Sequence, residues 1–130
     1  TVPELVQTII LTRGEGATPM PPREQLADLA SHRATLCVYL SVALADSVQR
    51  QLLAHYPPET PLAVLHRVTW PDERVFTGRL DELVSIVQAQ QLTRTTLIVV
   101  SPALGARRGR SHLYDPAKGH GFRAPREEAR

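Results

Sequence analysis

The chain has 130 residues, 42% of them hydrophobic, and a formal net charge of +2 at pH 7. This length predicts a single domain with a modest core, and no apolar run approaches the roughly 20 residues that cross a bilayer, so we expect no membrane partner. The basic residues are dispersed, and their one dense cluster, ARRGR, has no interleaved aromatic residues, which argues against nucleic acid as a partner.

The apolar pattern predicts strands that alternate with helices. Strands are expected at residues 6–13, 34–42, 61–68, 74–80 and 95–100, and helices at residues 23–30, 43–55 and 81–91. The strand at 34–42 is apolar almost throughout, as is typical of a strand buried on both faces. Asp81 is expected to cap the last helix. The order β-α-β-α-β-β-α-β therefore predicts an α/β fold, a single domain with a five-stranded mixed sheet flanked by helices.

The two ends of the chain depart from this pattern. The first residues predict no signal peptide, and because the chain begins without Met we expect a piece of a longer protein. From Ser101 onward the composition turns to Gly, Arg and Pro without a hydrophobic period. We therefore predict a domain at residues 1–105 and a tail at residues 106–130 that is ordered only where something holds it.

No segment reads as a self-contained catalytic or metal site. Gly14 and Gly16 follow the first strand, but prolines rather than a helix come next, which disfavours a phosphate-binding loop. Ser41 ends the second strand without the glycines of a nucleophile elbow. No histidine pair has the helical spacing of a zinc site, and the single cysteine, Cys37, indicates a buried thiol in a cytoplasmic protein. We therefore predict no catalytic residue and no metal ligand.

The strand ends suggest where a ligand would bind. In open α/β sheets, ligands lie beyond the carboxyl ends of the strands, which read here LTRGEG, YLSV, HRVTWPDE and VVSPALG. These segments offer backbone groups, small residues, Arg13, Arg67 and Trp70, which suit a flat neutral group with arginines nearby for acids. Trp70 lies in the bend between two strands, where it either covers local core or faces a bound molecule.

Several strings in order along nearly the whole chain resemble one family. They are VPELVQTIILTRGEGATPMP, ATLCVYLSV, YPPETPLAVLHRVTWPDERVFTGRLDEL, TRTTLIVVSPALG and SHLYDPAKGHGFR. Together they resemble the C-terminal domain of the tetrapyrrole (corrin and porphyrin) methylases. The strings LTRGEGATPMP and LYDPAKGHGFR narrow the resemblance to the branch that acts on precorrin-4 or cobalt-precorrin-4.

The resemblance implies a dimeric, two-domain enzyme with S-adenosylmethionine in the cleft between its domains and a tetrapyrrole in an adjoining trough. Such an enzyme would methylate C-11 of precorrin-4 in cobalamin biosynthesis and release S-adenosylhomocysteine. The N-terminal domain of that family has no counterpart in this chain, so the chain alone is expected to be inactive. The alternatives are another tetrapyrrole methylase, acting on cobalt-precorrin-4 or uroporphyrinogen, and a non-catalytic binding or dimerisation module.

On matched positions, the resemblance assigns Leu40, Val68 and Thr96 to the cofactor. Leu40 would lie against the adenosine, and the backbone of Val68 would face the nucleoside. Val68 and Thr96 are bulkier than the residues usual there, so their side chains should point away or the cofactor pocket narrows. Arg13 and Arg74 are expected at the edge of the tetrapyrrole trough, where guanidinium groups would bind carboxylates.

Overall fold

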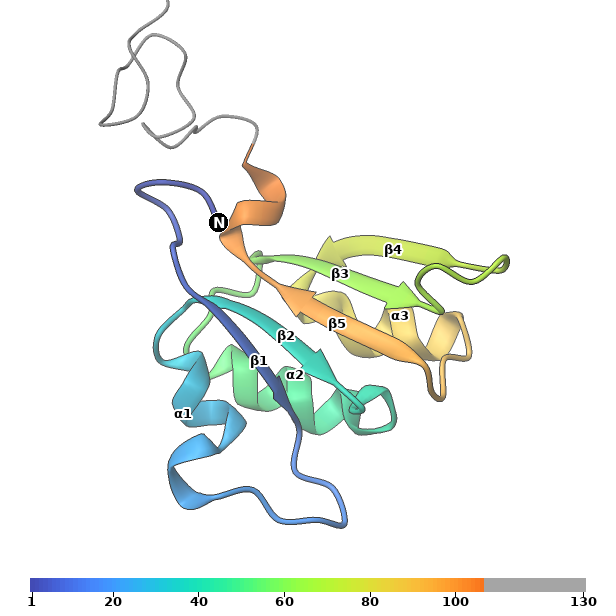
Figure 1. The fold of residues 1–130 in the computed structure, drawn as a ribbon, viewed down its shortest axis with the longest axis horizontal. Helices are drawn as coiled ribbons and strands as arrows, with labels where there is room; N and C mark the ends of the chain where they lie inside the picture. Colours follow the sequence, from blue (N-terminus) through green and yellow to red (C-terminus); the bar gives the residue numbers. More distant parts are fainter. Residues whose placement is uncertain (107–130) are drawn as a thin grey trace, which may run out of the picture.

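A computed structural model describes residues 1–106 of the chain, so the predicted tail, with the string LYDPAKGHGFR, lies outside the described residues apart from Ala106. The strands are β1 (Ile9–Arg13), β2 (Thr35–Tyr39), β3 (Pro61–His66), β4 (Arg74–Arg79) and β5 (Thr96–Val100) (Figure 1). The α-helices are α1 (Leu26–Ala30), α2 (Ala45–Leu53) and α3 (Leu83–Ala89). Short 3-10 turns lie at Pro22–Glu24, Val42–Leu44, Leu80–Glu82 and Pro102–Gly105. Over residues 1–106, no helix has the length and apolar character needed to cross a membrane.

The strands form one mixed sheet in the order β1-β2-β5-β3-β4, which confirms the predicted fold class. β1 and β2 are parallel, β5 is antiparallel to both β2 and β3, and β3 and β4 form an antiparallel hairpin. The carboxyl ends of β1, β2 and β3 therefore meet the amino ends of β4 and β5 along one edge, which we call the site edge. The prediction that VVSPALG lies at this edge is wrong, because β5 runs the opposite way and brings Thr96 there instead.

All three α-helices lie on one side of the sheet (Figure 1), and the core lies between these two layers. Alternate strand residues point into it and meet the apolar sides of α2 and α3, as expected from the periods of the two element types. The most fully buried of them are Leu36, Val38, Leu62, Val64, Ile98 and Val100 from the strands and Val48, Leu52 and Leu83 from the helices.

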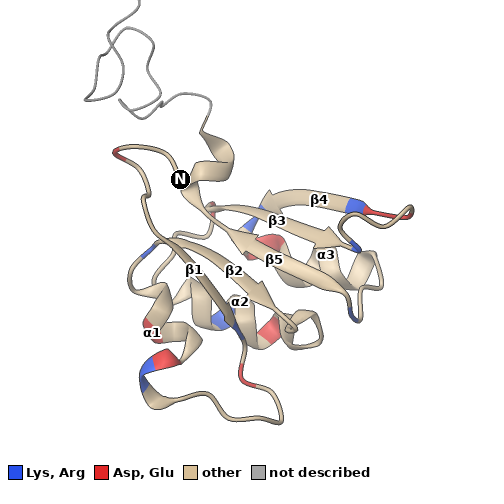
Figure 2. Ribbon diagram, viewed as in Figure 1, with Lys and Arg blue, Asp and Glu red and all other residues tan. Residues whose placement is uncertain are grey.

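The opposite side of the sheet is apolar and, in the described part of the chain, carries no helix. We call this side the open face; by strand register it also carries Arg13, Thr35, Thr77 and Arg79, and its apolar residues include Ile9, Leu11, Cys37, Tyr39, Ala63, Leu65, Val75, Leu97 and Val99. On this face Leu11 of β1 is 66% exposed and Tyr39 of β2 is 44% exposed. The exposure of Tyr39 shows that the prediction of β2 as a strand buried on both faces is wrong. Figure 2 shows that charged residues lie at strand ends, in loops and on helices, which leaves the middle of this face uncharged.

One local feature differs from the sequence prediction. Asp81 does not cap the helix that follows, because its carboxylate pairs with the Arg79 guanidinium at 2.8 Å. The Glu82 side chain does not cap it either, since it accepts a hydrogen bond from the Arg79 N–H, before the helix, at 2.7 Å. The Ser101 side chain, where the composition changes, is buried and bonds to Thr35 at 2.6 Å.

Candidate functional site

A cavity of about 560 Å³ lies at the site edge. Its walls come from the turn after β2, from Leu65 and Val68 around the end of β3, and from residues 93–97, which lead into β5. Leu40, Val68 and Thr96, which the sequence assigns to one ligand, all line this single cavity. The sheet brings them together because β5 lies between β2 and β3 and begins where those two strands end.

A buried serine shapes the turn that carries Leu40. The Ser41 hydroxyl donates a hydrogen bond to the Tyr39 carbonyl at 2.7 Å and accepts one from the Gly14 N–H at 2.6 Å. This side chain is fully buried, so Ser41 holds the turn and offers no nucleophile. The turn places Leu40 in the left-handed region, at φ 54°, with 88% of the residue exposed at the cavity. β2 therefore ends at Tyr39, earlier than predicted.

The bend that carries Val68 is held by Arg67. The Arg67 carbonyl accepts a hydrogen bond from the Trp70 N–H at 3.0 Å, and its guanidinium lies 5.3 Å from the centre of the indole ring. The same guanidinium pairs with Asp72 and, by donating a hydrogen bond to it, lowers the pKa of that carboxyl group. Trp70 is 54% exposed, so it packs on Arg67 and does not cover the core. These contacts fix the bend beside the cavity.

The side chain of Thr96 is held away from the cavity by its own hydrogen bonds. Its hydroxyl donates to the Arg94 carbonyl at 2.9 Å and lies 3.0 Å from Nδ1 of His66. A hydroxyl has one proton to donate, so His66 Nδ1 must carry the proton and donate it to Thr96. Thr96 is only 7% exposed. The extra bulk at this position is therefore accommodated beneath the cavity and does not fill it.

Strained backbone is concentrated at the site edge. Besides Leu40, the non-glycine residues Arg67, Thr69 and Thr95 have φ values of 50°, 71° and 53°. Such conformations cost of order 1–3 kcal/mol each and persist only where surrounding contacts impose them. One such contact is the hydrogen bond from the Arg67 N–H to the Thr95 carbonyl at 2.9 Å, which joins two walls of the cavity. The cavity is therefore a shape that the fold maintains, since several independent contacts determine it.

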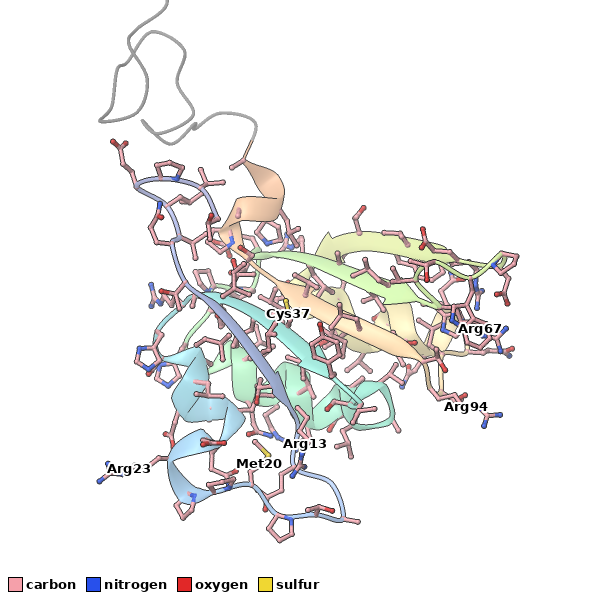
Figure 3. All side chains as sticks on the ribbon, in the orientation of Figure 1. Arg13, Met20, Arg23, Cys37, Arg67 and Arg94 are labelled. Carbon is pink, nitrogen blue, oxygen red and sulfur yellow. The ribbon has the colours of Figure 1, made fainter. Side chains whose placement is uncertain are left out.

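The two arginines expected at the tetrapyrrole trough lie at the site edge but outside this cavity. The Arg13 guanidinium, labelled in Figure 3, donates to the carbonyls of Thr18 and Pro19 at 3.0 and 3.2 Å and so orders the loop after β1. The Arg74 guanidinium lies 5.6 Å from the centre of the Phe76 ring on β4. Because β1 and β4 are the two outermost strands, the sheet places these arginines on opposite sides of the cavity.

The cavity is suited to binding a flat organic group. Its volume falls within the range of about 300–1,000 Å³ that is usual for small-molecule sites. Apolar side chains such as Leu40, Leu65 and Val68 can contact a ring, and the exposed residues 93–95 can offer polar groups for hydrogen bonds. Among the described lining residues, Tyr39 and Arg94 carry the titratable side chains, so the walls contain no acid–base pair. Arg94 was missed by the sequence reasoning, because nothing local distinguishes it from the chain's other arginines.

The sequence and the fold are similar to those of known proteins. Residues 2–84 match the family model described as Tetrapyrrole (Corrin/Porphyrin) Methylases. The chain belongs to this family. A solved tetrapyrrole methylase, a cobalt precorrin-4 methyltransferase, superposes on this chain with a TM-score of 0.78 at 36% identity, covering 80% of this chain and 44% of the other. A uroporphyrin-III C-methyltransferase from Thermus thermophilus, complexed with S-adenyl homocysteine, has the same fold, with a TM-score of 0.64 at 22% identity.

Alignments with two curated relatives show what share of a tetrapyrrole methylase this chain corresponds to. The cobalt-precorrin-4 C(11)-methyltransferase of Methanocaldococcus jannaschii is 39% identical over 125 residues, and the precorrin-4 C(11)-methyltransferase of Pseudomonas aeruginosa is 42% identical over 127 residues. The alignments cover 95% and 91% of this chain but 48% and 51% of the relatives. The chain therefore spans about half the length of the curated relatives it matches.

Proposed function

We propose that this chain is the C-terminal half of an S-adenosylmethionine-dependent methyltransferase that methylates C-11 of precorrin-4 in cobalamin biosynthesis. The observation that supports this most strongly is the single cavity shared by Leu40, Val68 and Thr96, in a chain 42% identical to a precorrin-4 C(11)-methyltransferase. In this proposal residues 1–105 form the C-terminal domain, residues 106–130 form its tail, and a missing N-terminal domain supplies the opposite wall of the cofactor cleft.

The proposed role of this chain is to bind and orient the cofactor. When bound, S-adenosylmethionine supplies a methyl group that is electrophilic because it is attached to a sulfonium sulfur. Leu40 and Leu65 would contact the adenine ring, while the backbone at Val68 and at residues 94–96 would face the ribose. The strained turns hold these groups in place before the ligand arrives. Alignment of this kind can supply about 7–11 kcal/mol of the barrier reduction.

The experiment that tests this function restores the missing half. We would join residues 1–130 to the N-terminal half of the Pseudomonas aeruginosa enzyme and follow transfer of a labelled methyl group from S-adenosylmethionine to precorrin-4. We call this the joined protein. It is expected to transfer the label, whereas the chain alone is expected to transfer none. Turnover by the chain alone would contradict the half-site proposal, and a folded but inactive joined protein would favour a non-catalytic module.

The substrate is tested in the same assay. Cobalt-precorrin-4 and uroporphyrinogen are the rival acceptors, and both kinds of precorrin-4 enzyme occur among the curated relatives at similar identity. We expect transfer to precorrin-4 to exceed transfer to either rival. Faster methylation of uroporphyrinogen would move the enzyme to another branch of the family.

We further propose that the complete enzyme is a cytoplasmic homodimer in which the part of the open face formed by β1 packs against a second copy. The support is chemical: Ile9 and Leu11 of β1 are 51% and 66% exposed, lie beside β2, and are outside the lining of the cavity. Apolar surfaces of this kind mark interaction sites in soluble proteins. The surface is also uncharged at its centre, so two copies could meet without burying unpaired charge.

A further inference from the structure

Most described arginines near the site edge already have a partner. Arg13 donates to backbone carbonyls, Arg67 pairs with Asp72, and Arg74 lies over Phe76. Arg94 differs, since within residues 1–106 no ion pair or side-chain hydrogen bond engages its guanidinium. It is also the one arginine among the described residues that line the cavity. Its charge is therefore available at the mouth of the proposed cofactor site.

Two hydrogen bonds hold the backbone on the C-terminal side of Arg94. The Arg94 carbonyl accepts a hydrogen bond from Thr96 Oγ1 at 2.9 Å, and Thr96 is itself held by His66. The next carbonyl, that of Thr95, accepts a hydrogen bond from the Arg67 N–H at 2.9 Å. Figure 3 shows Arg94 extending from this segment beyond the same end of the sheet that carries Arg67. The starting point of the side chain is thus set, and only its own rotamers need to be ordered on binding.

The surroundings of Arg94 select the kind of group that it can bind. The lining of the cavity within the described residues includes no acidic side chain, so the guanidinium has no internal competitor there. The apolar side chains of Leu40, Leu65 and Val68 line the same cavity and carry no charge. A guanidinium binds a carboxylate through two parallel hydrogen bonds.

We propose that Arg94 is the residue of this site that binds a carboxylate of the ligand and so determines specificity for carboxylated ligands. The inference rests on the proposed function. Two sources offer this chemistry: the amino-acid end of the methyl donor and the acidic side chains of the tetrapyrrole. The role differs from that of Arg13 and Arg74, which lie outside the cavity.

The test uses the joined protein with Arg94→Gln, which removes the charge, and Arg94→Lys, which keeps it without the paired geometry. Arg23→Gln is the matched control, because Arg23 is an exposed arginine on the 3-10 turn before α1, outside the cavity. Binding would be measured for two pairs of probes. S-adenosylhomocysteine and 5′-methylthioadenosine share a nucleoside, but only the first has a carboxylate; uroporphyrin III and its methyl ester differ in the same way.

Arg94→Gln should weaken binding of at least one carboxylated probe by about tenfold and leave its neutral counterpart unchanged. Arg94→Lys should weaken binding of the carboxylated probe less than Arg94→Gln does, and Arg23→Gln should bind all probes with the affinity of the wild type. A loss confined to S-adenosylhomocysteine identifies the methyl donor as the source, and a loss confined to uroporphyrin identifies the tetrapyrrole.

Three results would overturn the inference. If Arg94→Gln binds all probes like the wild type, Arg94 has no such role, although the proposed function stands. If Arg94→Gln weakens binding of the carboxylated and the neutral probes equally, the role of Arg94 is structural. If the wild-type joined protein binds none of the probes, the proposed function fails, and this inference fails with it.

Discussion

Leu40 combines two features that are unfavourable in an isolated domain. Its backbone is left-handed, which costs roughly 1–2 kcal/mol for a residue with a Cβ, and its apolar side chain is 88% exposed. Neither feature is needed to hold the turn, because Ser41 and Gly14 hold it through their own hydrogen bond. The simplest physical reason for a leucine there is contact with another molecule.

Leu40→Gly should separate stability from binding. Glycine tolerates this φ but loses roughly 0.5–1 kcal/mol of backbone entropy, so the variant should be as stable as the wild type or more stable by up to about 1.5 kcal/mol. In the joined protein it should bind S-adenosylhomocysteine about tenfold more weakly, because the apolar contact is gone. Thermal melting and calorimetry measure the two effects, and a large fall in melting temperature would show that Leu40 is structural.

Ser41→Ala should destabilise the domain by about 2–3 kcal/mol. The substitution leaves the Gly14 N–H and the Tyr39 carbonyl without their partner in a buried position. Ser85→Ala is the control, because Ser85 is exposed on α3, where alanine favours the helix. Chemical denaturation measures both variants, and equal stabilities would mean that the turn does not depend on the buried hydroxyl.

The residues of the site were predictable to different degrees. Leu40, Val68 and Thr96 came from the family resemblance, and the fold places them along one cavity. Ser41 was considered only as a nucleophile, since its partner Gly14 lies 27 positions away and no local pattern reveals that bond. Arg94 carries no local signal at all, because its place in the cavity depends on the direction of β5.

At the scale of elements, the link between α2 and β2 depends on a tyrosine. Tyr56 follows α2, is almost fully buried, and donates a hydrogen bond to the carbonyl of Ala34, just before β2. Burial disfavours the charged phenolate and raises the pKa of Tyr56 from 10.0 to about 12. The neutral phenol is therefore part of the folded state.

This shift predicts a loss of stability in alkali. The native state holds the Tyr56 proton more tightly than the unfolded chain, so its contribution is complete below pH 10.0 and is lost as the pH rises toward 12. The loss amounts to about 3 kcal/mol at most. Tyr56→Phe should remove this part of the pH dependence and lower stability at pH 7 by about 1–3 kcal/mol. Denaturation between these pH values measures it, and an unchanged slope in the variant would contradict the assignment.

The elements themselves were predicted well, because each strand and helix has its own apolar period. Two properties were not local and were missed. The direction of β5 depends on the crossovers around it, so its carboxyl end could not be placed from its own residues. β2 is apolar on both faces, yet helices cover only one of them. This was missed because an apolar sequence pattern does not distinguish a face that packs in the core from one that is left open.

At the scale of the whole molecule, the open face predicts self-association. Leu11→Arg should shift the joined protein from dimer to monomer, because it places a charge within an apolar interface. The control is Ser85→Arg, since Ser85 is exposed on α3, on the other side of the sheet from the open face. Sedimentation velocity measures the mass of each. A wild-type monomer, or equal effects of the two variants, would contradict this use of the open face.

The central claim is that the cavity at the site edge is one wall of a methyl-donor site. Binding of S-adenosylhomocysteine to the joined protein, measured by calorimetry, tests it most directly when wild type is compared with Val68→Trp. Val68 lines the cavity and is 42% exposed, so the larger side chain should fill the cavity without disturbing the core. Ala89→Trp places the same side chain on an exposed position of α3, outside the cavity and on the other side of the sheet from the open face, as a control. The account predicts that the wild type and Ala89→Trp bind the ligand and that Val68→Trp binds at least about tenfold more weakly. Equal affinity for all three proteins would contradict it.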